Sequence, residues 1–125
     1  MHSPFDYSLC NQTVTVYRMK DGRISRNVYD NCYLDFETRV DTDTYGQQLE
    51  RRFTLILPGT EQLLQPEDRI YAGQGPALYT LVWEDFIPAK VEGLMQVQYV
   101  KPCFWNGKIC HTEAGNKGGF RGFGG

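Results

Sequence analysis

The sequence predicts a small all-β domain, a barrel or sandwich of about six to eight short, mostly antiparallel strands with projecting loops. Its 125 residues are the size of one domain. Eight Tyr and seven Phe favour strands over helices. Several short segments alternate apolar and polar residues at every second position, and turn signals separate them. We therefore expect one β-rich domain with a single core.

The first third of the chain carries clear strand and turn signals. Residues 1–12 show no strand pattern and are expected to form an N-terminal arm. Residues 13–18 (Thr-Val-Thr-Val-Tyr-Arg) alternate and are rich in β-branched side chains, which predicts a strand. The pair Asp21-Gly22 predicts a tight hairpin turn. A long strand over residues 24–39 should follow, with a bulge or bend at its polar interruption.

The middle of the chain alternates between irregular and strand-like segments. Residues 40–50 are polar and lack a pattern, so we expect an exposed loop. Residues 51–57 (Arg-Arg-Phe-Thr-Leu-Ile-Leu) predict a strand that Pro58 ends. Residues 61–65 favour one helical turn. A Pro-Glu-Asp turn then leads into a short strand that ends at Gly73.

The last third begins with two more expected strands, at residues 78–83 and 94–100. Pro102 should interrupt the second of them. The pair Asn106-Gly107 then predicts a two-residue hairpin turn, the strongest such signal in the chain.

Residues 112–125 contain six Gly, too many to pack a core of their own. We expect a flexible C-terminal arm there and a barrel domain over residues 13–111. Lys108, Lys117 and Arg121 against Glu113 give residues 106–125 a charge of +2, so the rest of the chain carries −4.

The overall charge of −2 argues against general nucleic-acid binding, which usually accompanies a strongly basic domain. No apolar run is long enough to span a membrane. The N-terminus lacks the features of a signal peptide, so synthesis in a cytoplasm is expected.

The cysteines are Cys10, Cys32, Cys103 and Cys110. The second hairpin turn would place Cys103 directly opposite Cys110, at a spacing that permits a disulfide. A cytoplasmic setting favours reduced, half-buried thiols instead. A zinc site is the third alternative, for which His111 beside Cys110 is a weak hint.

No constellation of reactive side chains emerges, so we expect no enzyme, no cofactor and no metal. The histidines are His2 and His111, and the expected role of His111 is an exposed position at a strand end. Asp35 and Glu37 share one strand face, which fits a solvated surface better than a hydrolase site.

A calcium loop is a weaker alternative. Asp41, Asp43 and Gly46 match three loop positions, but Arg52 replaces the terminal Glu.

The candidate contact residues are aromatic or lie on predicted loops. Trp83 should belong to the core. The candidate interface residues are Trp105, Phe120, Arg121 and Phe123. A single-strand-binding barrel that stacks bases on Tyr29, Tyr33 and Trp105 is an alternative that the −4 body opposes.

Four segments, taken in order, resemble small phage structural proteins: residues 13–18, residues 28–35, Phe-Thr-Leu-Ile-Leu-Pro at 53–58, and Leu-Gln-Pro-Glu-Asp-Arg-Ile-Tyr-Ala-Gly at 64–73. The resemblance is to minor capsid, head-closure (stopper) or head–tail connector proteins of tailed bacteriophages. It covers residues 13–111. The glycine- and phenylalanine-rich tail and the extra cysteines depart from it.

The resemblance implies a β-barrel subunit that forms a homo-oligomeric ring, expected to have six copies, in the neck of the virion. Such a ring lies between the portal-adaptor protein and the tail-terminator or tail-tube protein, and it closes the channel behind packaged DNA. The loop with Asp41, Asp43 and Tyr45 would then face the channel and could contact DNA. A tail terminator or another tail structural protein is the nearest alternative.

Overall fold

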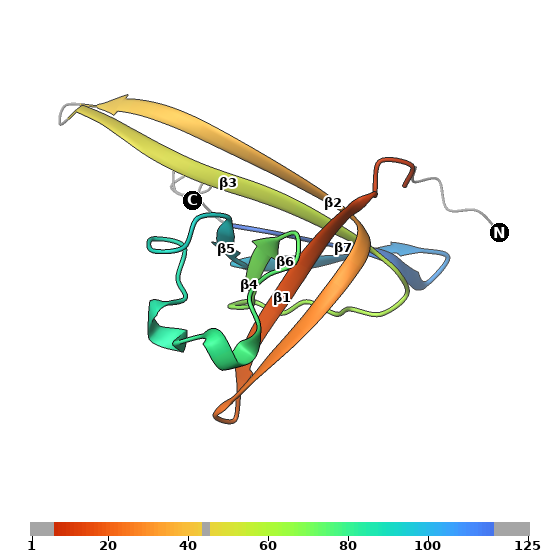
Figure 1. The fold of residues 1–125 in the computed structure, drawn as a ribbon. Coiled ribbons are helices and arrows are strands. Elements are labelled where there is room, and N and C mark those ends of the chain that lie inside the picture. Colours follow the sequence, from red (N-terminus) through yellow and green to blue (C-terminus); the bar gives the residue numbers. More distant parts are fainter. Residues whose placement is uncertain (1–6, 44–45, 117–125) are drawn as a thin grey trace.

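The computed structural model describes residues 7–43 and 46–116, with the backbone alone for 38–43 and 46–51. Within these residues the strands are β1 (Gln12–Lys20), β2 (Arg23–Asp43), β3 (Gly46–Pro58), β4 (Arg69–Ala72), β5 (Leu94–Gln96), β6 (Tyr99–Trp105) and β7 (Lys108–Gly115). They form one curled antiparallel sheet in the order β5-β4-β1-β2-β3-β7-β6, a half-barrel (Figure 1). The predicted all-β class is confirmed.

Strand β1 is buried on both faces. Val14 and Val16 point into the barrel core, as their alternation predicts. Tyr17 faces the other side, where it packs against Phe86 in a second, smaller cluster. The Tyr17 hydroxyl donates a hydrogen bond of 2.7 Å to the carbonyl of Pro76. The long connection between β4 and β5 therefore acts as a cover for the outer face of β1.

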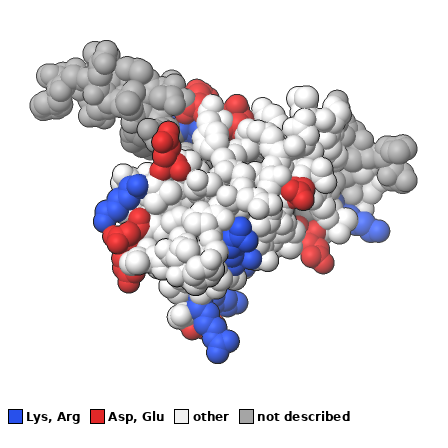
Figure 2. Space-filling model, viewed as in Figure 1, with Lys and Arg blue, Asp and Glu red and all other residues white. Residues whose placement is uncertain are grey.

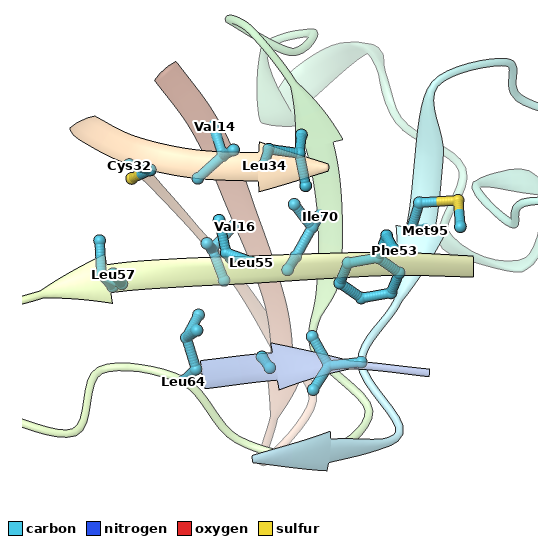
Figure 3. Packing of buried hydrophobic residues seen from close by; sticks show 12 residues of the cluster. Val14, Val16, Cys32, Leu34, Phe53, Leu55, Leu57, Leu64, Ile70 and Met95 are labelled. Atoms are coloured by element: carbon cyan, nitrogen blue, oxygen red, sulfur yellow. The ribbon is translucent and has the colours of Figure 1, made fainter. Parts of the chain in front are cut away.

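The main core joins residues from strands that lie far apart in the sequence (Figure 3). Its buried members are Val14, Val16, Cys32, Leu34, Phe53, Leu55, Leu57, Leu64, Ile70, Met95, Val97 and Ala114. Burial raises the pKa of the Cys32 thiol to about 12, so this cysteine behaves as a core residue and not as a nucleophile.

Both predicted two-residue turns are present. Asp21 and Gly22 have φ of 53° and 76°, and Asn106 and Gly107 have the same pair of values. These left-handed conformations suit Asp, Asn and Gly, which explains why the two dipeptides occur at these tips.

The prediction of a loop over residues 40–50 is wrong for residues 40–43 and 46–50, and residues 44 and 45 lie outside the described residues. The ladder between β2 and β3 continues without a shift from Tyr33↔Ile56 to Asp43↔Gly46. Apolar alternation marks a strand only where one face is buried. The outer ladder carries no such pattern, so the sequence does not show it.

Other predicted elements of the middle region also need correction. Residues 78–83 form no strand; the connection instead contains two short 3₁₀ turns, η1 (Leu78–Thr80) and η2 (Trp83–Asp85). Residues 61–65 contain no helical turn. Residues 94–100 divide into β5 and the start of β6. Leu81 and Trp83 pack against the Tyr17 cluster, whereas Met95 and Val97 are buried in the main core, and a local apolar pattern does not distinguish these roles.

A bulge changes the register of the last hairpin. Trp105 pairs with Lys108, as the turn predicts, but the register shifts so that Cys103 lies opposite His111 and not opposite Cys110. Pro102 does not interrupt the strand, because β6 lies at the edge of the sheet, where a missing backbone donor is tolerated.

Residues 112–115, assigned by the sequence to a C-terminal arm, lie in strand β7 instead, and residues 117–125 of that predicted arm lie outside the described residues. Strand β7 continues to Gly115, and the side chains of Thr112 and Ala114 are fully buried. A Cβ atom on Gly115 would lie only 2.7 Å from the carbonyl oxygen of Phe53 and from the ring of Tyr99. Gly115 is therefore a packing residue and not the start of a flexible tail.

Candidate assembly surfaces

Residues 64–70 (Leu-Gln-Pro-Glu-Asp-Arg-Ile) form a turn that is fixed to strand β1 by Arg18, and this turn with Arg18 is called here the node. Leu64 and Ile70 are buried in the main core. Asp68 is 2% exposed, and its carboxylate accepts two hydrogen bonds of 2.8 Å from the guanidinium of Arg18. The backbone N–H of Gln65 donates to the same carboxylate at 2.8 Å. The Asp68 carboxylate therefore holds the turn against β1, and the motif has a structural role.

The hydrogen bond from Arg18 to Asp68 raises the pKa of the guanidinium, which keeps Arg18 charged. Arg69 is held differently, with its guanidinium carbon 3.6 Å from the centre of the Trp83 ring. It donates to the carbonyls of Trp83 and Phe86 at 2.6 and 2.7 Å. Trp83 is partly buried and lies in η2, not in a strand.

A cleft of about 360 Å³ lies beside the node. Its lining residues are Arg18, Met19, Lys20, Gln65, Pro66, Glu67, Asp68, Arg69, Trp83 and Gln96. The node and the Arg69 contacts already engage Asp68, Arg18 and Arg69, so their hydrogen-bonding groups mainly hold the fold.

The tip of the β6–β7 hairpin presents two large aromatic residues. Phe104 is well exposed and Trp105 is 41% exposed. A groove of about 640 Å³ lies beside Trp105, lined by Tyr7, Gly59, Thr60, Trp105, Asn106, Lys108, Ile109 and Cys110. Exposed aromatic side chains next to a groove are typical of contact surfaces. Trp105 therefore remains a candidate interface residue.

His111 is buried, which corrects the expectation of an exposed position. It is 6% exposed, and its Nδ1 lies 2.7 Å from the hydroxyl of Tyr7. Burial lowers the pKa of His111 from its ordinary value. The contact anchors the end of the N-terminal segment to β7, at a separation of 104 residues.

The cysteines are free thiols. Cys110 donates a hydrogen bond of 3.2 Å to the carbonyl of Cys103, and its sulfur lies 4.0 Å from Nδ1 of His111. Across residues 7–43 and 46–116, no group of three or more His, Cys, Asp or Glu side chains is placed to hold a metal ion. Asp35 and Glu37 are exposed on β2, opposite Thr54 and Arg52 in register.

The most distinctive surface is a projecting two-stranded segment, called here the ribbon, which comprises residues 37–43 of β2 and 46–52 of β3. Strand β1 pairs with β2 only as far as Cys32, and β7 pairs with β3 only from Thr54. The seven pairs from Glu37↔Arg52 to Asp43↔Gly46 extend beyond these partners. At a strand rise of 3.3 Å, the ribbon is about 20 Å long. Figure 1 shows it leaving the barrel.

The core ends where the ribbon begins. Leu34 and Phe53 are buried in the main core, whereas Phe36, two residues further along β2, is 47% exposed. An isolated two-stranded ribbon has little stability of its own in water. We therefore expect the ribbon to become more stable when it contacts a partner molecule.

The predicted channel residues Asp41 and Asp43 lie in this ribbon, at the end of β2. Tyr45 lies outside the described residues, as do Phe120, Arg121 and Phe123. The structure thus brings two of the predicted loop positions onto a strand ladder, and Trp105 lies on a separate hairpin.

The 3₁₀ turns present a surface that the sequence did not indicate. Tyr79 is 92% exposed, and Leu78 and Val82 are also exposed. Their apolar character was the reason to expect a strand in this segment. No local signal separates an apolar strand from an apolar exposed connection.

The fold and these surfaces define a small all-β half-barrel with a projecting ribbon. No family model, curated protein or solved structure matches this chain. In the described part of the chain, no helix is long and apolar enough to cross a membrane.

Proposed function

We propose that this protein is a structural subunit of the neck ring of a tailed bacteriophage. In this role it closes the portal channel after DNA packaging and provides a surface for the tail. The sequence resemblance over residues 13–111 suggests the family, and the observed all-β half-barrel fits the fold that the resemblance implies.

The observation that carries the proposal is the ribbon, which projects from a tightly packed half-barrel. A ring needs identical contacts repeated at a fixed angle, which requires a rigid subunit. The Arg18–Asp68 node and the doubly buried β1 supply that rigidity. The ribbon supplies an extended contact element outside the core.

The node motif also supports a structural role. Among the acidic residues whose side chains the structure describes, Asp68 of the node is the only buried one. Arg18 and the backbone N–H of Gln65 donate hydrogen bonds to its carboxylate. The exposed aromatic residues lie on two different parts of the surface of one small domain, Phe104 and Trp105 at the β6–β7 hairpin and Tyr79 in η1. Several separate contact surfaces suit a subunit that touches neighbours on more than one side.

The test is a variant that lacks the ribbon. Phe36 and Phe53 are a register pair, so residues 37–52 can be replaced by Asn-Gly, which makes a two-residue hairpin turn. In a phage with this gene disrupted, the wild-type chain should restore tailed particles and the shortened chain should leave tailless heads. Electron microscopy of labelled particles should place the wild-type protein at the neck.

The matched control is Asp85→Ala, which removes an exposed carboxylate far from the ribbon in sequence. This control should restore tailed particles fully. Normal tail joining by the shortened chain, or label that is absent from the neck, would reject the proposal.

A further inference from the structure

The hairpin between β1 and β2 carries an unbalanced positive charge. Lys20 and Arg23 lie directly opposite each other on the two sides of the turn. Like charges in such a pair repel and destabilise the hairpin. Both side chains are exposed, and Asp21 is the one carboxylate in the turn itself.

Arg26 adds a third positive charge to the hairpin, but it lies three residues after Arg23 and therefore on the opposite face of β2. It donates to the carbonyl of Gly75 at 2.8 Å and to that of Pro76 at 3.2 Å, which are neutral groups. Arg18, in contrast, is neutralised by Asp68. Lys20 and Arg23 are called here the basic tip.

The ribbon has the opposite imbalance. Its register contains two complementary pairs, Glu37↔Arg52 and Arg39↔Glu50. Asp41 lies opposite Gln48, and Asp43 lies opposite Gly46.

Asp35, at the base of the ribbon, is exposed and lies opposite Thr54. Asp35, Asp41 and Asp43 thus have no opposite charge in register. Arg51, which lies opposite Thr38, is the single cation of the ribbon without a charged residue opposite it. The ribbon and its base therefore have a surplus of negative charge.

The two charged regions lie at opposite ends of the molecule. Arg23 begins β2 and Asp43 ends it, 21 residues later. In Figure 1 the β1–β2 turn lies at the bottom and the ribbon extends to the upper left. Figure 2 shows basic residues gathered at the lower end of the same view. A paired strand keeps its two ends apart, so these regions can meet only between molecules.

We propose that the ribbon of one copy docks on the basic tip of the next copy. This inference rests on the proposed ring function, because it names the contact from which the ring is built. The contact joins different patches of the two copies, so it repeats head to tail and closes when the rotation permits. The acidic ribbon offsets the repulsion between Lys20 and Arg23. The contact also places a partner beside a ribbon whose two outer edges pair with no other strand among the described residues.

The experiment uses charge reversals in the full chain. One variant combines Asp35→Lys with Asp41→Lys and makes the ribbon basic. The other combines Lys20→Glu with Arg23→Glu and makes the tip acidic. Each variant alone juxtaposes like charges, so its self-association should weaken by about tenfold or more. An equal mixture should associate nearly as well as the wild type, because each ribbon then meets a tip of opposite charge.

Self-association is measured by sedimentation equilibrium at about 50 mM and about 500 mM salt, since added salt screens exposed charges. Wild-type association should fall at the higher salt. The control combines Lys90→Glu with Lys101→Glu, which changes net charge as much as the tip variant but at two other exposed sites. It should associate like the wild type. Circular dichroism melting checks that every variant is folded.

Three results would overturn the contact: a wild-type chain that stays monomeric at both salt concentrations, reversed variants that associate normally, or a mixture that fails to recover. Phage complementation separates this inference from the neck function. Normal tailed particles from either reversed variant alone would reject the contact and leave the neck function standing. Recovered association of the mixture, with wild-type protein absent from the neck, would keep the contact and reject the function.

Discussion

The inner and outer halves of the β2–β3 ladder are made from the same two strands but are stabilised in different ways. The inner half contributes Leu34, Phe53 and Leu55 to the core. The outer half, from Glu37↔Arg52 onward, extends past the neighbouring strands β1 and β7. Backbone pairing alone thus defines a strand, but burial decides how strongly it is held. The barrel should tolerate loss of the ribbon, and the ribbon should depend on partners.

The largest effect should come from the node in the barrel. Asp68→Ala leaves Arg18 without its carboxylate and should lower the free energy of unfolding by about 3 kcal/mol. Chemical denaturation measures the loss. Asp85→Ala removes the exposed partner of Lys90 and should cost about 0–1 kcal/mol. Equal losses in the two variants would show that burial does not distinguish these pairs.

A smaller loss is expected at the end of β7. Gly115→Ala forces a Cβ against the Phe53 carbonyl and the Tyr99 ring, which should cost about 1–3 kcal/mol. Thr60→Ala, at an exposed position, is the control and should change stability by about 0.5 kcal/mol or less. A Gly115→Ala variant as stable as the wild type would mean that the glycine-rich tail already begins there.

The barrel should also lose stability in acid through His111. Burial depresses its pKa in the folded protein, so the unfolded chain binds the proton more readily. The contribution of neutral His111 to the free energy of unfolding is therefore complete above the ordinary histidine pKa of about 6.5, and it is lost as the pH falls below that value. Melting temperatures across this range should fall less in His111→Gln than in the wild type. An identical acid slope in both proteins would contradict the assignment.

The smallest effect on folding should come from removing the ribbon. The chain with residues 37–52 replaced by Asn-Gly should melt within a few degrees of the wild type, because the core ends before Glu37. A shorter connection also costs slightly less entropy to close. Thermal melting followed by circular dichroism tests this. A large drop in melting temperature would show that ribbon and barrel form one cooperative unit.

The sequence by itself determined the strands that bury one face and the turns that need special residues. Val14 and Val16 alternate because they enter the core, and Asp21-Gly22 and Asn106-Gly107 adopt left-handed conformations that few residues accept. These are local requirements, so they leave a local record in the sequence.

Only the tertiary structure decided the features that depend on distant neighbours. Tyr17 is buried because the β4–β5 connection covers β1, and His111 is buried beside Tyr7 from the other end of the chain. The bulge after Cys103 moved Cys110 away from the expected pairing. The ribbon is a strand ladder because β2 and β3 continue to pair after the core has ended. No residue pattern within a short window reports such contacts, since their energies arise between segments that meet only when the chain has folded.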